Sequence, residues 1–359
     1  RSVSWHYCFS QNEKLPIPNE AIDSSCAQVN NDSNLLFLYD KYYYHLSEKT
    51  TLDEETKFAE FSPRLNPLHA LNQIIYGAPG TGKTYSSIEF AMAIIENRQN
   101  NQTPQTIEQR RELMTEYSKR VSEGRVVFTT FHQSYGYEEF VQGIRPNVGA
   151  GAINFKKVDG VFKSIADTAR HNPAKNYVLI IDEINRGNIS KIFGELITLI
   201  EDDKRLGELN QLSVVLPMGE PFSVPNNLYI IGTMNSADKS ISLIDTALRR
   251  RFSFVEMAPD ATLIENETLR TVLLSLNTYI KKELRSTDLL VGHAYFLGKT
   301  IDDLQQIMNK SIIPLLYEYF YDDEAKVRKA LECLSGTDCV IDSDYSGRIR
   351  IKKSEKSRD

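Results

Sequence analysis

The stretch "NQIIYGAPGTGKTYSSIEFAMAIIEN", residues 72–97, decides the fold class of this chain. It begins with a short apolar run at 72–77, passes through a glycine-rich turn at 77–84, and ends in a helical pattern at 85–97. Continuous apolar runs are typical of parallel strands that are covered on both faces. A strand, a glycine-rich turn and a helix in this order are the context in which the pattern G-x-x-x-x-G-K-[ST] indicates a nucleotide site.

The turn predicts a phosphate-binding loop made of eight consecutive residues, Gly77, Ala78, Pro79, Gly80, Thr81, Gly82, Lys83 and Thr84. Glycines allow the backbone N–H groups to turn toward phosphate oxygens, and the helix N-terminus that follows favours negative charge. We expect Lys83 to reach the β- and γ-phosphates and Thr84 to be a ligand of Mg²⁺. A purely structural glycine-rich turn is the weaker interpretation.

Further apolar runs at 125–131, 175–182 and 226–234 predict three more strands, with helical patterns between them. Strands that alternate with helices indicate an α/β sheet. The run at 175–182 delivers Asp182 and Glu183 to the carboxyl end of a strand, where ligands collect in open α/β sheets. We expect Asp182 to hold the metal and Glu183 to polarise an attacking water as the general base.

The next strand leads to Asn235 and Asp238, and a helix-like stretch after it ends in Arg249, Arg250 and Arg251. An amide at this edge of the sheet can orient a water or the γ-phosphate without adding charge. Cations in the last turn of a helix complement its dipole for about 0.3–1 kcal/mol, and one arginine would suit that purpose. Three in a row favour arginine fingers that act on a neighbour's nucleotide, Arg250 and Arg251 ahead of Arg249, which requires an oligomer.

After residue 260 we expect the strands of the sheet to stop and helices to follow, with the tail at 347–359 either a solvated end or an edge strand. Amphipathic patterns at 265–285 and 301–320 predict two helices, the second divided at Pro314. The predicted fold is α/β, a P-loop NTPase core with a parallel sheet followed by a small all-helical lid. The expected parts are an N-terminal segment or linker at 1–65, the nucleotide-binding core at 66–258, the lid at 259–335 and a basic tail at 336–359.

The composition of the 359 residues is that of a globular protein, with 41% hydrophobic residues and a net charge of −6. This charge argues against a surface that binds nucleic acid over its whole extent. No apolar run approaches the roughly 20 residues that span a bilayer, and the first residues lack a signal peptide's apolar core. The four cysteines show no zinc spacing. We expect a cytoplasmic protein with reduced thiols and no membrane partner, and, because a natural chain does not start at Arg1, residues upstream of it.

Several motifs in a fixed order resemble the McrB-like AAA+ GTPases, the motors of modification-dependent restriction systems. After the phosphate loop come "FHQSYGYEEFVQGIRP" (131–146), "DGVF" (159–162), "IIDEINRGNISKIFGEL" (180–196), "MNSADKS" (234–240), "LRRRFSF" (248–254) and "VGHAYF" (291–296). The resemblance covers about residues 66–325. The first and fourth of these motifs are not general features of AAA+ proteins.

The resemblance implies a hexameric motor that hydrolyses GTP with Mg²⁺ and couples this to DNA translocation and to activation of a nuclease of the McrC type. DNA would be reached through the complex or through a missing N-terminal domain. In the family, the residue matching Asn235 helps to position the catalytic water, Asp238 completes the signature, and the arginines act across subunits. Lys239 stands where the signature has arginine, and lysine lacks the planar fork of that side chain. GTP preference rests on the resemblance, since the chain has no N-K-x-D box.

Alternatives remain open at this point. An ATP-driven remodeller of the MoxR kind would use the same residues to hydrolyse ATP instead of GTP. A non-hydrolysing assembly scaffold would not need all of these residues. The 131–146 motif is either a loop facing a ring pore or partner, or a structural plug against the sheet. His293 either approaches the nucleotide from the lid or is an ordinary core histidine, and residues 1–65 have no assigned role.

Overall fold

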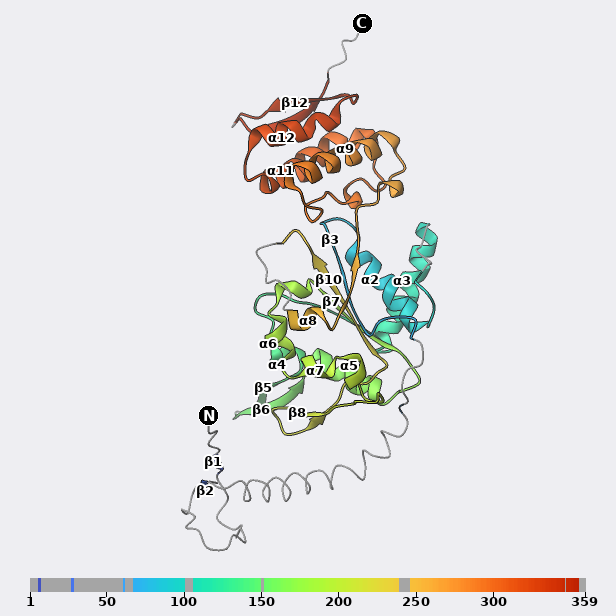
Figure 1. Cartoon of the computed structure of the whole chain (residues 1–359), viewed down its shortest axis with the longest axis vertical. Helices are drawn as coiled ribbons and strands as arrows, with labels where there is room; N and C mark the ends of the chain where they lie inside the picture. The colour runs from blue at the N-terminus through green and yellow to red at the C-terminus, as the bar shows by residue number, and fades with distance from the viewer. Residues whose placement is uncertain are drawn as a thin grey trace. The chain divides into compact units, whose positions relative to one another are not determined.

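The structure, a computed structural model (Figure 1), describes residues 61, 67–100, 106–149, 152–238, 246–345 and 347–354, together with two short N-terminal strands. The chain divides into two compact units, Arg1–Ser62 and Pro63–Asp359. In the first unit, β1 (His6–Tyr7) and β2 (Ala27–Gln28) form an antiparallel pair. All other elements in the described part of the chain belong to the second unit.

A five-stranded parallel sheet in the order β11–β3–β10–β7–β4 forms the centre of the core domain. Its strands are β3 (Asn72–Gly77), β4 (Val126–Thr130), β7 (Tyr177–Asp182), β10 (Leu228–Asn235) and β11 (Ser253–Glu256). The predicted α/β fold with a parallel sheet is confirmed. Asn235 is paired with Gly77 in the register, and β7 ends at Asp182 on the other side of β10. The ends of the three central strands therefore meet at one edge.

Helices cover both faces of the sheet, as the apolar strands require (Figure 1). Side chains alternate along a strand, so Ile75 and Ile180 pack with α2 (Lys83–Ile95), while Ile74 and Ile181 belong to the core on the opposite face. The helix α3 (Ile107–Ser122) lies beside α2. The opposite face is covered by α4 (Tyr137–Phe140), α5 (Val161–Arg170), α6 (Ile189–Phe193) and α7 (Leu196–Leu199).

The apolar residues of 190–202 follow a helical pattern, but the helix is broken at Gly194, and α6 and α7 are separate helices. Gly194 has a φ of 52°, a left-handed conformation that glycine adopts without a steric cost. The Tyr137 ring lies close, since a Cβ on Gly194 would come within 3.1 Å of its Cε2. Tyr137 also donates a hydrogen bond of 2.6 Å to Glu195. This tertiary contact accompanies the break, which the apolar periodicity alone does not reveal.

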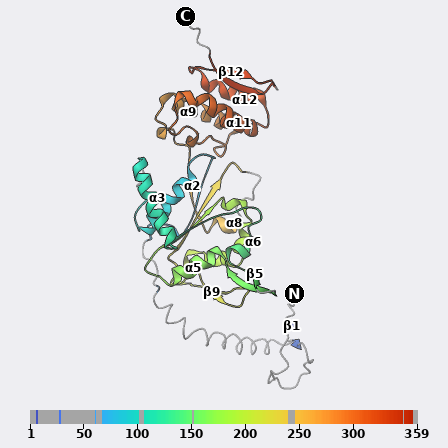
Figure 2. The ribbon, with the colours of Figure 1, turned by 180° about the vertical axis from the view of Figure 1, so that it is seen from behind.

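Two antiparallel hairpins flank this helical layer, and neither is expected from the sequence. The strands β5 (Gln142–Gly149) and β6 (Ala152–Asp159) form the longer one, and β8 (Val214–Val215) and β9 (Pro221–Phe222) form the shorter. From the front and from behind, β5 and β6 project from the helices of the core (Figures 1 and 2).

The second domain contains α9 (Glu267–Leu284), α10 (Leu304–Ile307), α11 (Ile313–Tyr319) and α12 (Glu324–Ala330). Pro314 was expected to divide the helix over 301–320, but it lies in the first turn of α11, where the missing N–H is tolerated. The irregularity precedes it, as a π-helical segment at Met308–Ile312 that joins α10 to α11.

A strand lies in the tail at 347–359, as its edge-strand interpretation allowed, but the partner strand before it was not expected. A hairpin of β12 (Cys339–Ser343) and β13 (Ile349–Lys353) packs on the helices, and Ile349 and Ile351 are buried in the same hydrophobic core. In the part of the chain that the structure describes, no helix combines the length and the apolar character needed to cross a bilayer.

Candidate active site

The loop between β3 and α2 has the backbone that a phosphate-binding turn needs. Gly80 and Gly82 have φ values of 75° and 81°, in the left-handed region that favours glycine. Lys83 is buried, and its Nζ donates to the carbonyl oxygens of Gly77 at 3.0 Å and Ala78 at 2.8 Å. Burial lowers the pKa of Lys83 to about 8, against the opposing effect of the nearby Glu183, Asp182 and Asp238 carboxylates. The loop thus holds an amine at the start of a helix.

Asp182, at the end of β7, is fixed by two hydroxyl groups. Thr84 Oγ1 donates to Asp182 Oδ1 at 2.9 Å, and Thr233 Oγ1, from the neighbouring strand β10, donates to the same oxygen. The hydroxyl of Thr233 also accepts the backbone N–H of Glu183 at 3.2 Å. Thr233 therefore ties the two acidic residues to the sheet, although the sequence analysis assigned it no role.

Glu183 lies between two donors. Asn235 Nδ2 donates to Glu183 Oε1 at 2.7 Å, and Arg186 Nε donates to Oε2 at 3.2 Å. Glu183 itself has a φ of 53°, and backbone strain of this kind costs about 1–3 kcal/mol and collects at functional sites. Arg186 also reaches Asp238 Oδ2 at 3.5 Å. The structure thus brings the predicted Glu183, Asn235 and Asp238 together around an arginine that was not singled out; Lys239 lies outside the described residues.

A segment of the lid that follows α9 lies directly against the phosphate loop. Gly292 N donates to Pro79 O at 3.1 Å, and Ala294 N donates to Gly80 O at 3.0 Å. His293 is buried, its Nδ1 accepts the backbone N–H of Asp260 at 3.1 Å, and burial lowers its pKa. Because Nδ1 is an acceptor, the neutral ring carries its proton on Nε2, which faces Gly82. The histidine is packed as a core residue and also borders the loop.

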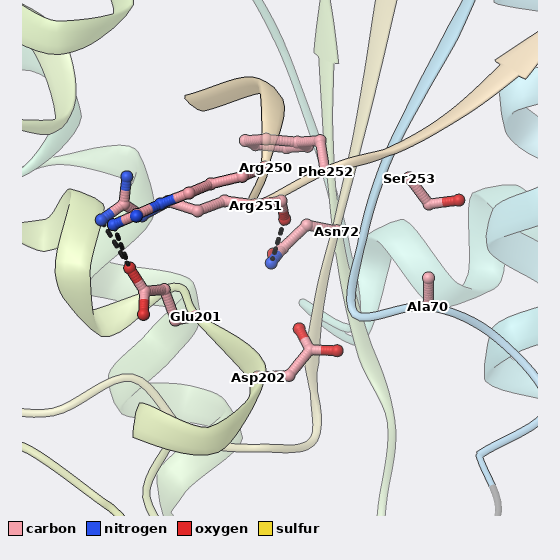
Figure 3. A pocket seen from close by; sticks show the side chains of 8 residues that line it. All are labelled: Ala70, Asn72, Glu201, Asp202, Arg250, Arg251, Phe252 and Ser253. Atoms are coloured by element: carbon pink, nitrogen blue, oxygen red, sulfur yellow. Dashed lines mark hydrogen bonds and ion pairs between the residues drawn. The ribbon is translucent and has the colours of Figure 1, made fainter. Parts of the chain in front are cut away.

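The arginine segment lies at the other end of the sheet. Figure 3 shows Arg250 and Arg251 converging on Glu201, while Asn72, the first residue of β3, donates to the backbone oxygen of Arg251. The Arg251 side chain is only 7% exposed, whereas that of Arg250 is 69% exposed. Of the two predicted fingers, Arg250 is the one accessible to another molecule, and Arg251 is held within the fold. Arg249 is also exposed and lies over the Phe254 ring.

The aromatic side chains of the 131–146 motif form a structural plug. Phe131 and Phe140 are fully buried, and Tyr135 stacks on Phe131 with ring centroids 4.9 Å apart. Both phenylalanines belong to the core on the helical side of the sheet. Of the two interpretations left open by the sequence, packing against the sheet holds for these residues, while His132 is exposed.

The bridging hydroxyl of Thr233 yields a prediction. Thr233→Val preserves the shape of the side chain but leaves the buried N–H of Glu183 without its partner, so we expect a loss of about 1–3 kcal/mol in the free energy of unfolding. Denaturant titration with urea measures this loss. Thr233→Ser keeps the hydroxyl and is expected to retain most of the stability; equal losses in both variants would show that the methyl group, not the hydroxyl, matters.

Two family matches cover parts of this unit: residues 109–252 match the AAA domain of the dynein-related subfamily, and residues 268–328 match the alpha-helical lid domain of McrB. The "Type IV methyl-directed restriction enzyme EcoKMcrB subunit" of Escherichia coli (strain K12) is 38% identical over 292 residues, 74% of this chain and 57% of that protein. The chain is an McrB-like AAA+ protein.

A second relative of this McrB-like chain is the "Type II restriction enzyme BsuMI component YdiS" of Bacillus subtilis (strain 168). It is 29% identical over 229 residues, which cover 54% of this chain and 59% of the relative. The McrB-like chain thus spans little more than half the length of either relative.

The residues missed in this McrB-like site left weak signals in the sequence. Thr233 is a polar residue in an apolar strand, two positions before Asn235 and so on the same face. Arg186 follows Glu183 by three residues, a spacing that a single helical turn brings together, and the two lie at a 3-10 turn, Ile184–Arg186. The contact between Gly292 and Pro79 joins segments more than 200 residues apart, and no local pattern reveals it.

Proposed function

We propose that this chain is a nucleoside triphosphatase, with GTP as the preferred substrate, and the oligomeric motor of a DNA restriction system. The observation that carries the proposal is the convergence of Lys83, Thr84, Asp182, Glu183 and Asn235 at one edge of the sheet. Each of these side chains is of the type that phosphoryl transfer to water requires, and three separate strand ends supply them.

Within this proposal, backbone N–H groups of residues 77–84 cradle the phosphates and Lys83 adds positive charge. The carboxylate of Asp182 and the hydroxyl of Thr84 are adjacent oxygen donors, which fits Mg²⁺, a cation held by one or two protein oxygens plus substrate phosphates. The described residues contain no group of three or more His, Cys, Asp or Glu side chains that would hold a metal by itself. When bound, Mg²⁺ neutralises developing charge on the phosphates.

Glu183 is the proposed general base. Its carboxylate accepts one hydrogen bond from Asn235, which orients it, and one from Arg186. Asn235 is uncharged, so it can orient Glu183 or a water without forming an ion pair with Lys83. Asp238 acts through Arg186, which it contacts, rather than on the substrate.

The position of the arginines supports an oligomer. Arg251 contacts Asn72, the first residue of β3, and the phosphate loop begins at Gly77, the last residue of β3. The six residues of this strand span about 17 Å. Arg250 therefore cannot reach the phosphate loop of its own chain, and we propose that it acts on the nucleotide of a second copy. A heterologous contact of this kind closes into a ring, for which we propose six subunits by analogy with the McrB family.

The proposed partners are a nuclease subunit of the McrC type and DNA, reached through the complex or through a domain outside this chain. Support comes from the two relatives, both named as parts of restriction enzymes.

Steady-state turnover with GTP and with ATP tests which of the two nucleotides is the preferred substrate. We expect kcat/KM for GTP to exceed that for ATP by at least about 100-fold, because a site that hydrogen-bonds one base leaves polar groups unpaired with the other. The assay uses the full chain with Mg²⁺, with and without a nuclease subunit, and Lys83→Ala serves as the background control. Faster hydrolysis of ATP would replace the proposal with an ATP-driven remodeller.

A further inference from the structure

The hairpin of β5 and β6, here called the ribbon, stands apart from every other sheet. It pairs with no third strand among those the structure describes, and its described side chains from Ile144 to Pro146 and from Phe155 to Asp159 are exposed. Phe155 is 74% exposed and Ile144 52%. A two-stranded hairpin is only marginally stable in water, and exposed apolar side chains gathered on one element mark interaction sites.

The two faces of the ribbon differ in character. Arg145 is paired with Lys156 in the register, so these two cations share one face. Pro146 is paired with Phe155 on the opposite face, to which Ile144 also belongs because side chains alternate along β5. The face of Arg145 and Lys156 is here called the basic face; the opposite face carries Phe155 and Ile144 and also Lys157, which is paired with Ile144.

The basic face carries an unfavourable contact for the ribbon on its own. Like charges directly opposite each other in a sheet are destabilising, and neither Arg145 nor Lys156 forms an ion pair with any residue that the structure describes. The neighbouring Lys157 differs, since its Nζ pairs with Glu220 at 2.6 Å. The protein thus supplies a counter-charge for Lys157 and leaves the facing pair for an external anion.

The base of the ribbon is held by polar contacts to the β8–β9 hairpin. Gln142 Nε2 donates to Glu220 Oε1 at 2.7 Å, and Met218 N donates to Gln142 Oε1 at 3.0 Å. Glu220 also pairs with Lys157 and, at 3.5 Å, with Lys163 of α5. These contacts fix the direction in which the ribbon leaves the core, so the basic face is presented in a defined orientation.

We propose that the ribbon is a contact surface for duplex DNA, with Arg145 and Lys156 of the basic face on backbone phosphates. A two-stranded β-ribbon is of a size that the major groove of B-DNA admits. Facing cations without protein counter-charges suit a backbone of regularly spaced phosphates. The choice of DNA over another polyanion rests on the proposed restriction function.

Binding of a fluorescein-labelled duplex of arbitrary sequence, followed by anisotropy with a non-hydrolysable GTP analogue, tests this surface. The variant Arg145→Ala/Lys156→Ala is expected to bind roughly 10- to 60-fold more weakly at 0.1 M salt and to lower the slope of log K against log salt by about 1.8, since each phosphate contact contributes about 0.9. The DNA affinities of the wild type and of this variant are expected to converge near 1 M salt. A matched double variant, Arg111→Ala/Lys119→Ala on the exposed side of α3, removes the same charge and leaves the slope unchanged.

Both double variants alter exposed side chains, and thermal melts together with basal nucleotide turnover establish that each is folded. An unchanged salt slope in the ribbon variant, or equal losses in the two variants, overturns the proposal. So does a ribbon variant that keeps its DNA affinity but no longer binds an isolated nuclease subunit, because the anion would then be an acidic protein surface. If the wild-type chain hydrolyses no nucleotide but the ribbon variant still loses DNA affinity, the proposed motor function fails and the DNA contact stands.

Discussion

Glu183→Gln is expected to lower kcat for nucleotide hydrolysis by about 10²- to 10⁴-fold, the usual contribution of a general base. The amide keeps the size of the side chain and the acceptor oxygen that receives the hydrogen bond from Asn235, so the site keeps its shape. The substitution removes the group that can take a proton from water, together with the negative charge and the acceptor oxygen that Arg186 contacts. Nucleotide affinity, measured by equilibrium binding of a fluorescent GTP analogue, is expected to change by less than a few fold.

Glu112→Gln is the matched control, because Glu112 is an exposed carboxylate on α3, remote from the phosphate loop. Single-turnover rates are compared with and without a nuclease subunit, since slow basal turnover alone does not identify the base. Equal rates for wild type and Glu183→Gln under both conditions would remove Glu183 from the mechanism.

Arg250→Ala is expected to lower turnover by about 10³-fold or more, the range found for arginine fingers, while each subunit still binds nucleotide. The reason is the proposed role in trans: Arg250 is exposed at the end of the sheet opposite the phosphate loop of its own chain. Arg251→Ala is expected to act differently. Its side chain is buried and paired with Glu201, so we expect a loss of about 1–3 kcal/mol in the free energy of unfolding.

Mixing two inactive proteins tests the action across subunits. Arg250→Ala keeps an intact phosphate loop, and Lys83→Ala keeps an intact Arg250, so a mixed oligomer contains some complete sites. We expect turnover to reappear on mixing and to scale with the fraction of such sites. Arg249→Ala, which loses a contact with the Phe254 ring, is the control for removing a neighbouring charge. Failure to recover any activity, with mixed oligomers present by size-exclusion chromatography, would contradict a role in trans.

Local sequence patterns predicted the strands and helices whose formation depends on residues close to one another in the sequence. The run at 175–182 predicted a buried strand, and β7 occupies Tyr177–Asp182 because continuous apolar residues satisfy a strand covered on both faces. The helix predicted at 85–97 overlaps α2 for the same kind of reason, since its apolar run from Ala91 to Ile95 is continuously buried, as expected of a helix that is covered all round. Long-range packing decided the rest. Gly194 breaks a helix beside the Tyr137 ring, and β13 buries Ile349 and Ile351 against distant helices.

By itself, the sequence determined the order of the strands along the chain and the chemical groups that follow them, because a phosphate loop and an acidic strand end are local patterns. Only the tertiary structure decided which groups meet. Parallel pairing of β10 with β7 brings Thr233 to Asp182, and the spacing between the ends of β3 separates Arg250 from the phosphate loop. The tertiary structure also gives two adjacent arginines different solvent exposure: Arg250 is exposed and Arg251 is buried. Solvent exposure depends on residues far away in the chain.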